Sequence, residues 1–369
     1  MNRLFRWDQM GLFLLALAAG ILPFAVPEVC AAALREGLTL CSGPLLLSLF
    51  PFLVVSRLLV QCPESDLLAM PFRLAAWGIG IRTPCAARVL CIGFLGGFAP
   101  AASAAAQAVR TGQLTVEEAD ALLPACICSG PSFVVLTVGQ SLLGSAELGV
   151  LLFASQITAN YLTAALLNRF AGVRSVKPGS AAPASSAPPR LDEILADAAI
   201  TYCKLCGFIL FFRMLAAGAG ALLPAGAGTL CAVLLEVCSG CDLASHTGRW
   251  GSLLCCAALS VQGLSVLLQV RTICPPEMTL RPLYWARLLH LPLSLALFYL
   301  LLPGGEADVF STLPARVLLM RRVPPDCALL VFAVCCMAAC TLRSGIRQVE
   351  QKQMARNAGG CCINSKILL

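Results

Sequence analysis

The chain has 369 residues, of which 59% are hydrophobic and 12% charged, with a mean hydropathy of +0.84 and a formal net charge of +7. Soluble proteins average about 45–50% apolar and about 25% charged residues, so this chain has too few charges to cover a surface that faces water. The composition excludes an ordinary soluble enzyme, a disordered chain and a nucleic-acid binder. It predicts an all-α polytopic membrane protein, because the apolar runs are long and continuous rather than alternating.

Residues 1–84 are predicted to form N-terminal membrane helices and an interfacial segment. An apolar stretch over residues 10–26 predicts a retained first helix, with a cleaved signal peptide as the alternative because small residues follow Cys30. Residues 40–60 predict a second span. Residues 62–84 contain three prolines and predict a loop with an interfacial amphipathic piece.

Residues 85–170 are less regular. The apolar run over residues 90–106 is broken by glycines, and the next apolar run is interrupted at Ser129-Gly130-Pro131. Between them, Thr115 is followed by two glutamates and is placed to cap a helix. Residues 148–167 predict an uninterrupted span.

The Ala/Pro/Ser-rich residues 171–190 predict a linker that divides the chain nearly in half. A second irregular segment over residues 191–275, C-terminal membrane helices over 276–343 and a basic tail over 344–369 follow. Because basic residues gather in the linker and the tail, both are predicted to be cytoplasmic. The second half starts with an amphipathic stretch over residues 191–198. The apolar runs of the second half cover residues 200–215, 221–236, 252–270, 289–302 and 327–342.

The two halves resemble each other weakly at their irregular points. Ser129-Gly130 aligns with Gln262-Gly263, and Gly97 aligns with Gly240, where a break is predicted over Cys238-Ser239-Gly240. Unpaired backbone at membrane depth is tolerated only where it is buried in protein or lines a wet cavity. Matching breaks in two halves therefore indicate a transporter's binding site, in which half-helix N-termini present N–H donors to an anion. The alternative is that glycine and proline are simply common in membrane helices.

Polar residues beside these breaks have two interpretations each. Glu236 ends an apolar run and either holds a coupling proton or sodium ion, or is paired with Lys204, with Arg213 or with a helix N-terminus. Four amide side chains either bind substrate or join helices to one another: Gln262, Gln269, Gln156 and Asn160.

The 21 cysteines lie mostly inside apolar runs and are interpreted as small packing residues. Cys203-x-x-Cys206 and Cys238-x-x-Cys241 have metal or redox spacing, but the chain has only two histidines. The sequence carries no nucleophile elbow, phosphate loop or zinc-protease motif. We therefore expect no enzyme, no catalytic residue, no metal and no cofactor.

A combination of motifs resembles the YlbJ (SpoVV) family of sporulation integral membrane proteins over residues 45 to 300. The motifs are Gly93–Phe98, Gly112–Ala119, Cys126–Gly139, Gly207–Phe212, Leu235–Gly240 and Gly263–Val270. The resemblance implies a nucleoside-recognition (gate) domain similar to concentrative nucleoside transporters, with two inverted repeats that each hold a re-entrant hairpin and a broken helix. It also implies a place in the outer forespore membrane of a spore-forming bacterium, where the family is thought to move dipicolinic acid.

The chain departs from that family's pattern in its first half. Gly96, Ala99 and Ser103 stand where the family hairpin has Ser, Pro and Lys. Ile127 and Cys128 stand where the family favours two Asn residues. These departures remove ligands that the family pattern supplies.

The sequence thus predicts a sporulation-associated transporter that moves a small anion, dipicolinic acid first, by alternating access. The alternatives are a transporter of a nucleoside-like molecule and a non-transporting membrane scaffold of the spore envelope. The expected partners are a small-molecule anion, a coupling proton or sodium ion, and membrane lipid, but no nucleic acid; a homo-oligomer is left open. The predicted substrate-binding residues are Gly97, Ser103, Ser129, Gly130, Ser132, Glu236, Ser239, Gly240, Gln262, Gly263, Ser265 and Gln269.

Overall fold

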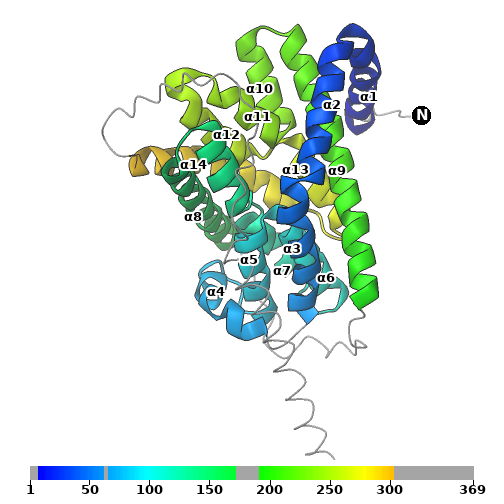
Figure 1. Ribbon diagram of the computed structural model, residues 1–369. Helices are drawn as coiled ribbons and strands as arrows, with labels where there is room; N and C mark the ends of the chain where they lie inside the picture. Colours follow the sequence, from blue (N-terminus) through cyan, green and yellow to red (C-terminus); the bar gives the residue numbers. More distant parts are fainter. Residues whose placement is uncertain (1–6, 62–64, 172–190, 303–369) are drawn as a thin grey trace, which may run out of the picture. The chain divides into compact units, whose positions relative to one another are not determined.

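The computed structural model describes residues 7–61, 65–171 and 191–302, which all belong to one compact unit (Figure 1). These residues form helices and no strand. The predicted linker, the span over residues 327–342 and the basic tail lie outside the described residues, apart from the first residue of the linker. The helices of the first half are α1 (Trp7–Ala25), α2 (Pro27–Ser42), α3 (Pro44–Gln61), α4 (Asp66–Gly78), α5 (Pro84–Gly96), α6 (Phe98–Arg110), α7 (Val116–Cys126), η2 (Ser132–Leu142) and α8 (Ala146–Ala171). Those of the second half are α9 (Leu191–Leu222), α10 (Ala225–Leu235), α11 (Val237–Ser245), η3 (Gly248–Trp250), α12 (Gly251–Val261), α13 (Gly263–Ile273) and α14 (Arg281–Leu301).

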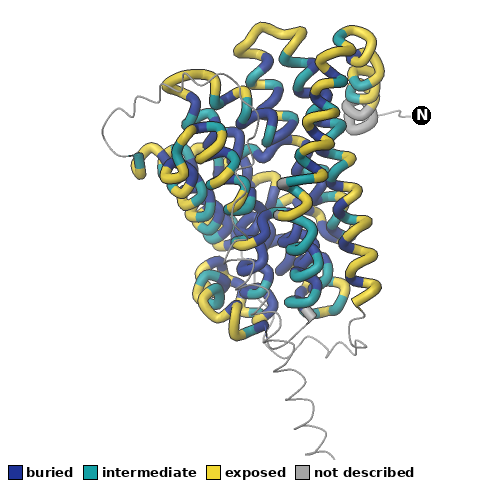
Figure 2. The backbone as a smooth tube through the Cα atoms, viewed as in Figure 1, coloured by how far each residue is buried: buried dark blue, intermediate teal, exposed yellow. Residues whose placement is uncertain are grey.

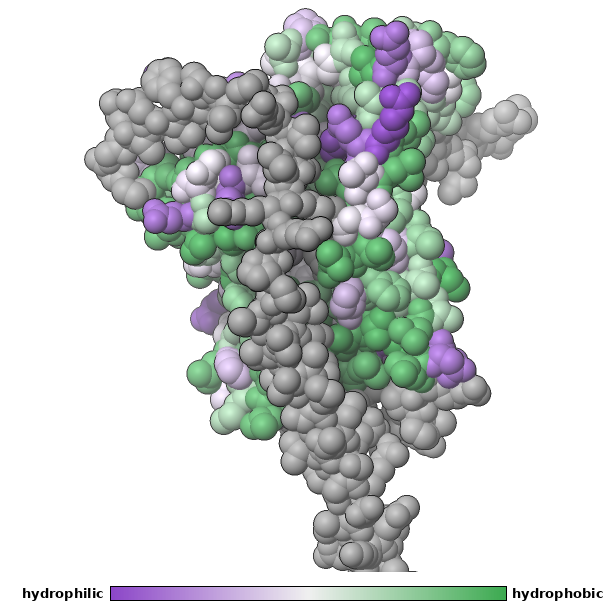
Figure 3. Space-filling model, in the orientation of Figure 1, coloured by the Kyte–Doolittle hydropathy of each residue, from purple (hydrophilic) through white to green (hydrophobic). Residues whose placement is uncertain are grey.

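Helices long and apolar enough to cross a membrane occur in both halves. Five stretches of the described chain meet that requirement: Pro27–Leu47, Ala146–Ala171, Leu191–Leu222, Gly248–Ile273 and Arg281–Leu301. Large apolar side chains such as Phe24, Phe170 and Leu300 are more than three-quarters exposed, and apolar residues predominate on the described face in Figure 3. Water would not favour so much exposed apolar surface, whereas lipid does. The described residues thus confirm the prediction of an all-α protein with several helices long and apolar enough to cross a membrane.

Local signals place most of the helix ends. Thr115 caps α7 as predicted, in a reciprocal arrangement in which its hydroxyl accepts from Glu118 N–H and the Glu118 carboxylate accepts from Thr115 N–H. The helix predicted over residues 40–60 is present as α3, but it starts later than predicted, because Gly43 interrupts the chain and Pro44 begins the new helix. The amphipathic start and the apolar run predicted after the linker form one unbroken helix, α9.

Four of the short breaks between consecutive helices in the described chain bear on the candidate site. In the first half α5 and α6 are divided at Gly97, and α7 and η2 are divided between Ile127 and Pro131. In the second half α10 and α11 are divided at Glu236, and α12 and α13 at Gln262. The break predicted at Cys238-Ser239-Gly240 was therefore placed a few residues too late: these residues lie inside α11.

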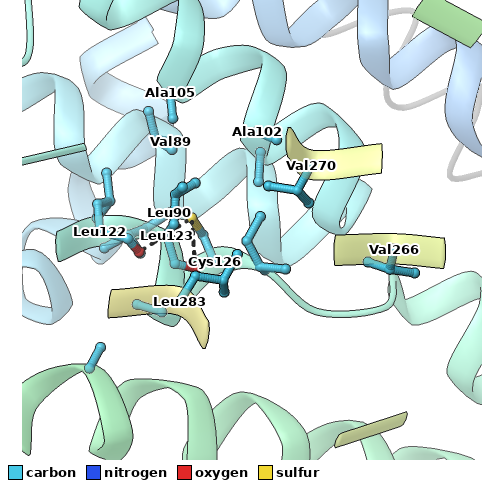
Figure 4. Close-up of a cluster of buried hydrophobic side chains, with 14 of the residues drawn as sticks. Val89, Leu90, Ala102, Ala105, Leu122, Leu123, Cys126, Val266, Val270 and Leu283 are labelled. Atoms are coloured by element: carbon cyan, nitrogen blue, oxygen red, sulfur yellow. Dashed lines mark hydrogen bonds between the residues drawn. The ribbon is translucent and has the colours of Figure 1, made fainter. Parts of the chain in front are cut away.

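The two halves share one apolar core. Figure 4 shows Ala102 of α6 beside Val270 of α13, and Val89 of α5, Leu122 of α7 and Val266 of α13 belong to the same buried cluster. Most residues of α6 and α7 are buried, and buried residues, drawn dark blue, occupy the interior in Figure 2. Because α6 is alanine-rich, its neighbours approach closely and enclose its interior residues. The breaks of both halves are consequently held at fixed positions inside protein.

Candidate functional site

The two interruptions of the first half cross each other at glycine. Gly97 has φ +80, and a Cβ added there would lie 2.7 Å from the nitrogen of Gly130. Only glycine accepts both that backbone conformation and that approach. The crossing therefore sets the start of α6 directly against the chain that leads into η2.

The two interruptions of the second half cross in a similar way. A Cβ added to Gly263, which has φ +69, would lie 3.0 Å from the nitrogen of Glu236. The preceding residue, Gln262, has φ 66, a left-handed conformation that is rare outside glycine. The Gln262 amide nitrogen donates to Ser129 Oγ at 3.4 Å and thereby joins the second crossing to the first.

A cavity of about 60 Å³ lies where these crossings meet. It is lined by the first residues of α6, η2 and α11, together with residues of α3, α9 and α13. In the part of the chain that the structure describes, the N-termini of α6 and η2 have no side-chain cap. Their first-turn amides are donors without a side-chain acceptor, and such donors favour an anion or a carbonyl oxygen of a ligand. A water molecule occupies about 30 Å³ in the liquid, so the cavity in this conformation holds about two waters.

Glu236 supplies a buried carboxylate to this cavity. Its side chain caps α11 by accepting from Cys238 N–H at 2.9 Å and from Ser239 N–H at 2.7 Å, and the Ser239 hydroxyl donates to it at 2.9 Å. Of the partners considered from the sequence, the structure therefore selects a helix N-terminus. Glu236 also lines the cavity, so its negative charge acts on any ligand bound there.

Two glutamine side chains bring unpaired polar atoms to the site. Gln269 is 2% exposed and lines the cavity; its amide nitrogen donates to Ser265 Oγ at 3.0 Å, while its amide oxygen has no partner among the described residues. The Gln262 amide oxygen is likewise buried and has no partner in that part of the chain. An unpaired buried amide costs about 1–3 kcal/mol, which a water or ligand that bonds to it recovers.

Arg287 holds the carbonyl ends of the broken helices. From α14 it donates to the Ile127 carbonyl at 3.0 Å, to Asn160 Oδ1 at 3.2 Å and to the Ser260 carbonyl at 3.4 Å. Ile127 ends α7 and Ser260 lies in the last turn of α12, so one guanidinium bonds at the C-terminal end of a half-helix from each half of the chain. A cation at such ends is favourable because the helix dipole is negative there.

The predicted binding residues fall into three groups in the structure. Gly97, Ser129, Gly130, Ser132, Glu236 and Gln269 line the cavity. Ser239, Gln262, Gly263 and Ser265 contact those residues without lining it. Ser103 and Gly240 lie apart: Ser103 is fully buried in α6, and Gly240 lies inside α11 where its missing Cβ allows the close approach of Val233.

Arg287 is the main residue of the site that the sequence analysis missed, whereas its partner Asn160 was considered as a substrate-binding or helix-joining amide. An apolar run was predicted over residues 289–302, which left Arg287 outside it. The helix begins at Arg281, so Arg287 lies within a candidate membrane span. A charge inside such a span is the signal that identifies it.

The cysteines are mostly buried at helix contacts, as their interpretation as packing residues predicts. Cys126 is representative: its thiol donates to the Leu122 carbonyl of its own helix at 3.4 Å (Figure 4). Within the described ranges no three His, Cys, Asp or Glu side chains are grouped to hold a metal ion.

Comparisons with protein-family models, curated proteins and solved structures found no match. The resemblance of the motifs to a sporulation family therefore stays a prediction, and the function is argued from the site itself.

Proposed function

We propose that this protein is a membrane transporter whose substrate binds where the four helix breaks meet, and that the substrate is a small organic anion. One observation carries the proposal: a single cavity is lined by the N-termini of broken helices from both halves of the chain. Broken helices are costly at membrane depth and are typical of transporter binding sites.

The order of the elements supports an alternating-access mechanism. The first half runs through α5 and α6, α7 and η2, and the long helix α8; the second runs through α10 and α11, α12 and α13, and the long helix α14. This parallel order is what two inverted repeats, each with a re-entrant hairpin and a broken helix, would produce. Rocking one repeat against the other would open the cavity to each side in turn.

The charges at the cavity assign a role to a coupling cation. Uncapped amides at α6 and η2 attract an anion, but the Glu236 carboxylate repels it. A proton or a sodium ion on Glu236 removes that repulsion, so anion and cation bind together more favourably than the anion alone. Coupled transport of an anion with a cation follows from this arrangement.

The motif resemblance narrows the proposal to dipicolinic acid moved across the outer forespore membrane of a spore-forming bacterium. Dipicolinate is a small planar dianion that suits amide donors. A nucleoside-like substrate is the alternative within the same site, because the amides of Gln262 and Gln269 also suit a neutral base.

A non-transporting scaffold of the spore envelope is the second candidate, and two observations favour it. The cavity holds only about 60 Å³, and Ile127 and Cys128 bring no amide side chain to it. If Glu236→Gln and Gln269→Ala both left spore dipicolinate at its normal content while deletion lowered heat resistance, the scaffold function would be the correct one.

The direct test is uptake by the full chain reconstituted in liposomes. Labelled pyridine-2,6-dicarboxylate should accumulate when a proton or sodium gradient is imposed, and labelled uridine should not. Glu236→Gln should abolish the dependence on the gradient, and Gln269→Ala should reduce uptake. Glu147→Gln and Gln140→Ala are matched controls, because both side chains are exposed and away from the cavity. Absence of uptake of either solute by well-folded protein would refute transport.

A further inference from the structure

A second and larger cavity lies beside the substrate site. It has a volume of about 360 Å³ and is bounded by α3, α6, α9 and α13. Ligand cavities run from roughly 300 to 1,000 Å³, so this one is large enough for a small solute in the present conformation. Its α9 residues lie in the half of that helix next to the linker, whose side of the membrane the basic residues predict to be cytoplasmic.

The lining of this cavity is cationic. Among the described residues that line it, Arg57, Arg110 and Lys204 contribute three positive charges, against the single carboxylate of Asp197. Arg57 forms an ion pair with Asp197. Arg110 and Lys204 form no ion pair within the described ranges, so two cations face the cavity without a carboxylate. Two uncompensated cations across one cavity favour a ligand with two negative charges.

Buried polar atoms on the inner wall provide an independent indication of a ligand. Arg57 is 9% exposed, and its Nε has no hydrogen-bond partner among the residues that the structure describes. The free amide oxygen of Gln269 belongs to a residue that is 2% exposed. Because the Ser265 hydroxyl can either donate or accept, the Gln269 amide can turn to present a donor instead. A carboxylate oxygen would satisfy both side chains.

Gln269 lines both cavities and is therefore the residue at which they adjoin. We propose that the larger cavity is a vestibule that binds a small soluble dicarboxylate, through Arg110, Lys204 and the inner donors, next to the substrate site. This inference rests on the proposed function for its place in a transport path, but not for the binding itself. A soluble ligand is favoured over a lipid phosphate because the inner donors lie on the buried wall, within reach of a small molecule.

The test is equilibrium binding of labelled phthalate to the full chain in nanodiscs of zwitterionic lipid, with neutral phthalamide as the comparison. Phthalate should bind and phthalamide should not. Arg110→Gln and Lys204→Gln should each weaken phthalate binding about tenfold, as expected for loss of one charge-assisted contact. Arg281→Gln is the matched control, since Arg281 is exposed and lies outside both cavities. Equal affinity in all three variants would overturn the proposal.

Asp197→Asn provides a test in the opposite direction. It removes the only carboxylate among the described residues that line the vestibule and releases Arg57, so phthalate should bind about two- to fivefold more tightly. A purely structural role of the Arg57–Asp197 pair predicts no gain. Weaker binding by Asp197→Asn would contradict the vestibule.

Two further measurements separate this inference from its alternatives. Phthalate binding without uptake of either labelled solute in liposomes would refute transport and support the vestibule. Uptake without phthalate binding would support transport and refute the vestibule. Loss of phthalate binding in discs that contain phosphatidylglycerol, with that lipid co-purifying, would assign the cavity to a lipid headgroup and overturn the soluble ligand.

Discussion

Replacing Arg287 tests whether one cation holds both helix breaks in place. Arg287→Met keeps the length and apolar stem of the side chain but removes its bonds to the Ile127 carbonyl at 3.0 Å and to Asn160 Oδ1 at 3.2 Å. Bonds from a charged donor contribute about 1.5–3 kcal/mol each, so about 3–6 kcal/mol is lost before compensation. Methionine also relieves the desolvation of a buried cation, and we expect a net destabilisation of about 2–4 kcal/mol.

The assay is thermal unfolding of the full chain in detergent, followed by tryptophan fluorescence and repeated with Arg287→Lys and Asn160→Ala. Lysine keeps the charge and should restore part of the loss. Asn160→Ala and Arg287→Met should not be additive, because both side chains donate to the Ile127 carbonyl. Arg281→Gln, on the same helix but exposed, should unfold like the parent. Unchanged unfolding of Arg287→Met, or strict additivity with Asn160→Ala, would refute this reasoning.

Three further substitutions probe the fold around the site, each by the same unfolding measurement. Gly263→Ala should destabilise by about 1–3 kcal/mol, since alanine at φ +69 is strained and its Cβ meets the backbone of Glu236; a stability equal to the parent would show that the crossing can separate. Thr115→Ala should cost about 1 kcal/mol by removing the cap of α7, with Thr229→Ala, at a half-buried position that caps no helix, as a control expected to differ by less than about half that. Asp120→Asn should destabilise by about 1–2 kcal/mol, because the carboxylate accepts three bonds from the loop before α14; no change would mean that this loop is held by other contacts.

Local sequence signals predict the interruptions that glycine and proline produce. Ser129-Gly130-Pro131 and Gln262-Gly263 mark their breaks to within a residue or two, because proline removes an N–H and glycine accepts a positive φ. The break at Glu236 carries neither residue. Glutamate is an uncommon N-cap, and the nearest glycine, Gly240, lies inside α11, so the break predicted at Cys238-Ser239-Gly240 was placed too late.

The composition of the cavities could not be predicted from spacing alone. Arg57, Arg110 and Lys204 lie on three different helices and gather only because α3, α6 and α9 border one cavity. Gln269 was predicted to bind substrate, but its contact with a second cavity depends on how α13 packs against α6 and α9. Long-range packing of this kind leaves no periodic trace in the sequence.

The carbonyl ends and the amide ends of the broken helices differ in their side-chain partners. This difference favours a ligand that carries several hydrogen-bond acceptors. At the carbonyl ends, Arg287 and Asn160 bond to Ile127, so those groups are satisfied within the protein. At the amide ends, only α11 has a side-chain acceptor, the carboxylate of Glu236, while α6 and η2 have none in the described chain. A ligand that reaches the cavity therefore meets backbone amides that no side chain caps, together with the Gln269 amide oxygen, which has no partner in the described chain. Carboxylate or carbonyl oxygens of a ligand would accept from these backbone amides, and a cation bound to Glu236 would neutralise the carboxylate.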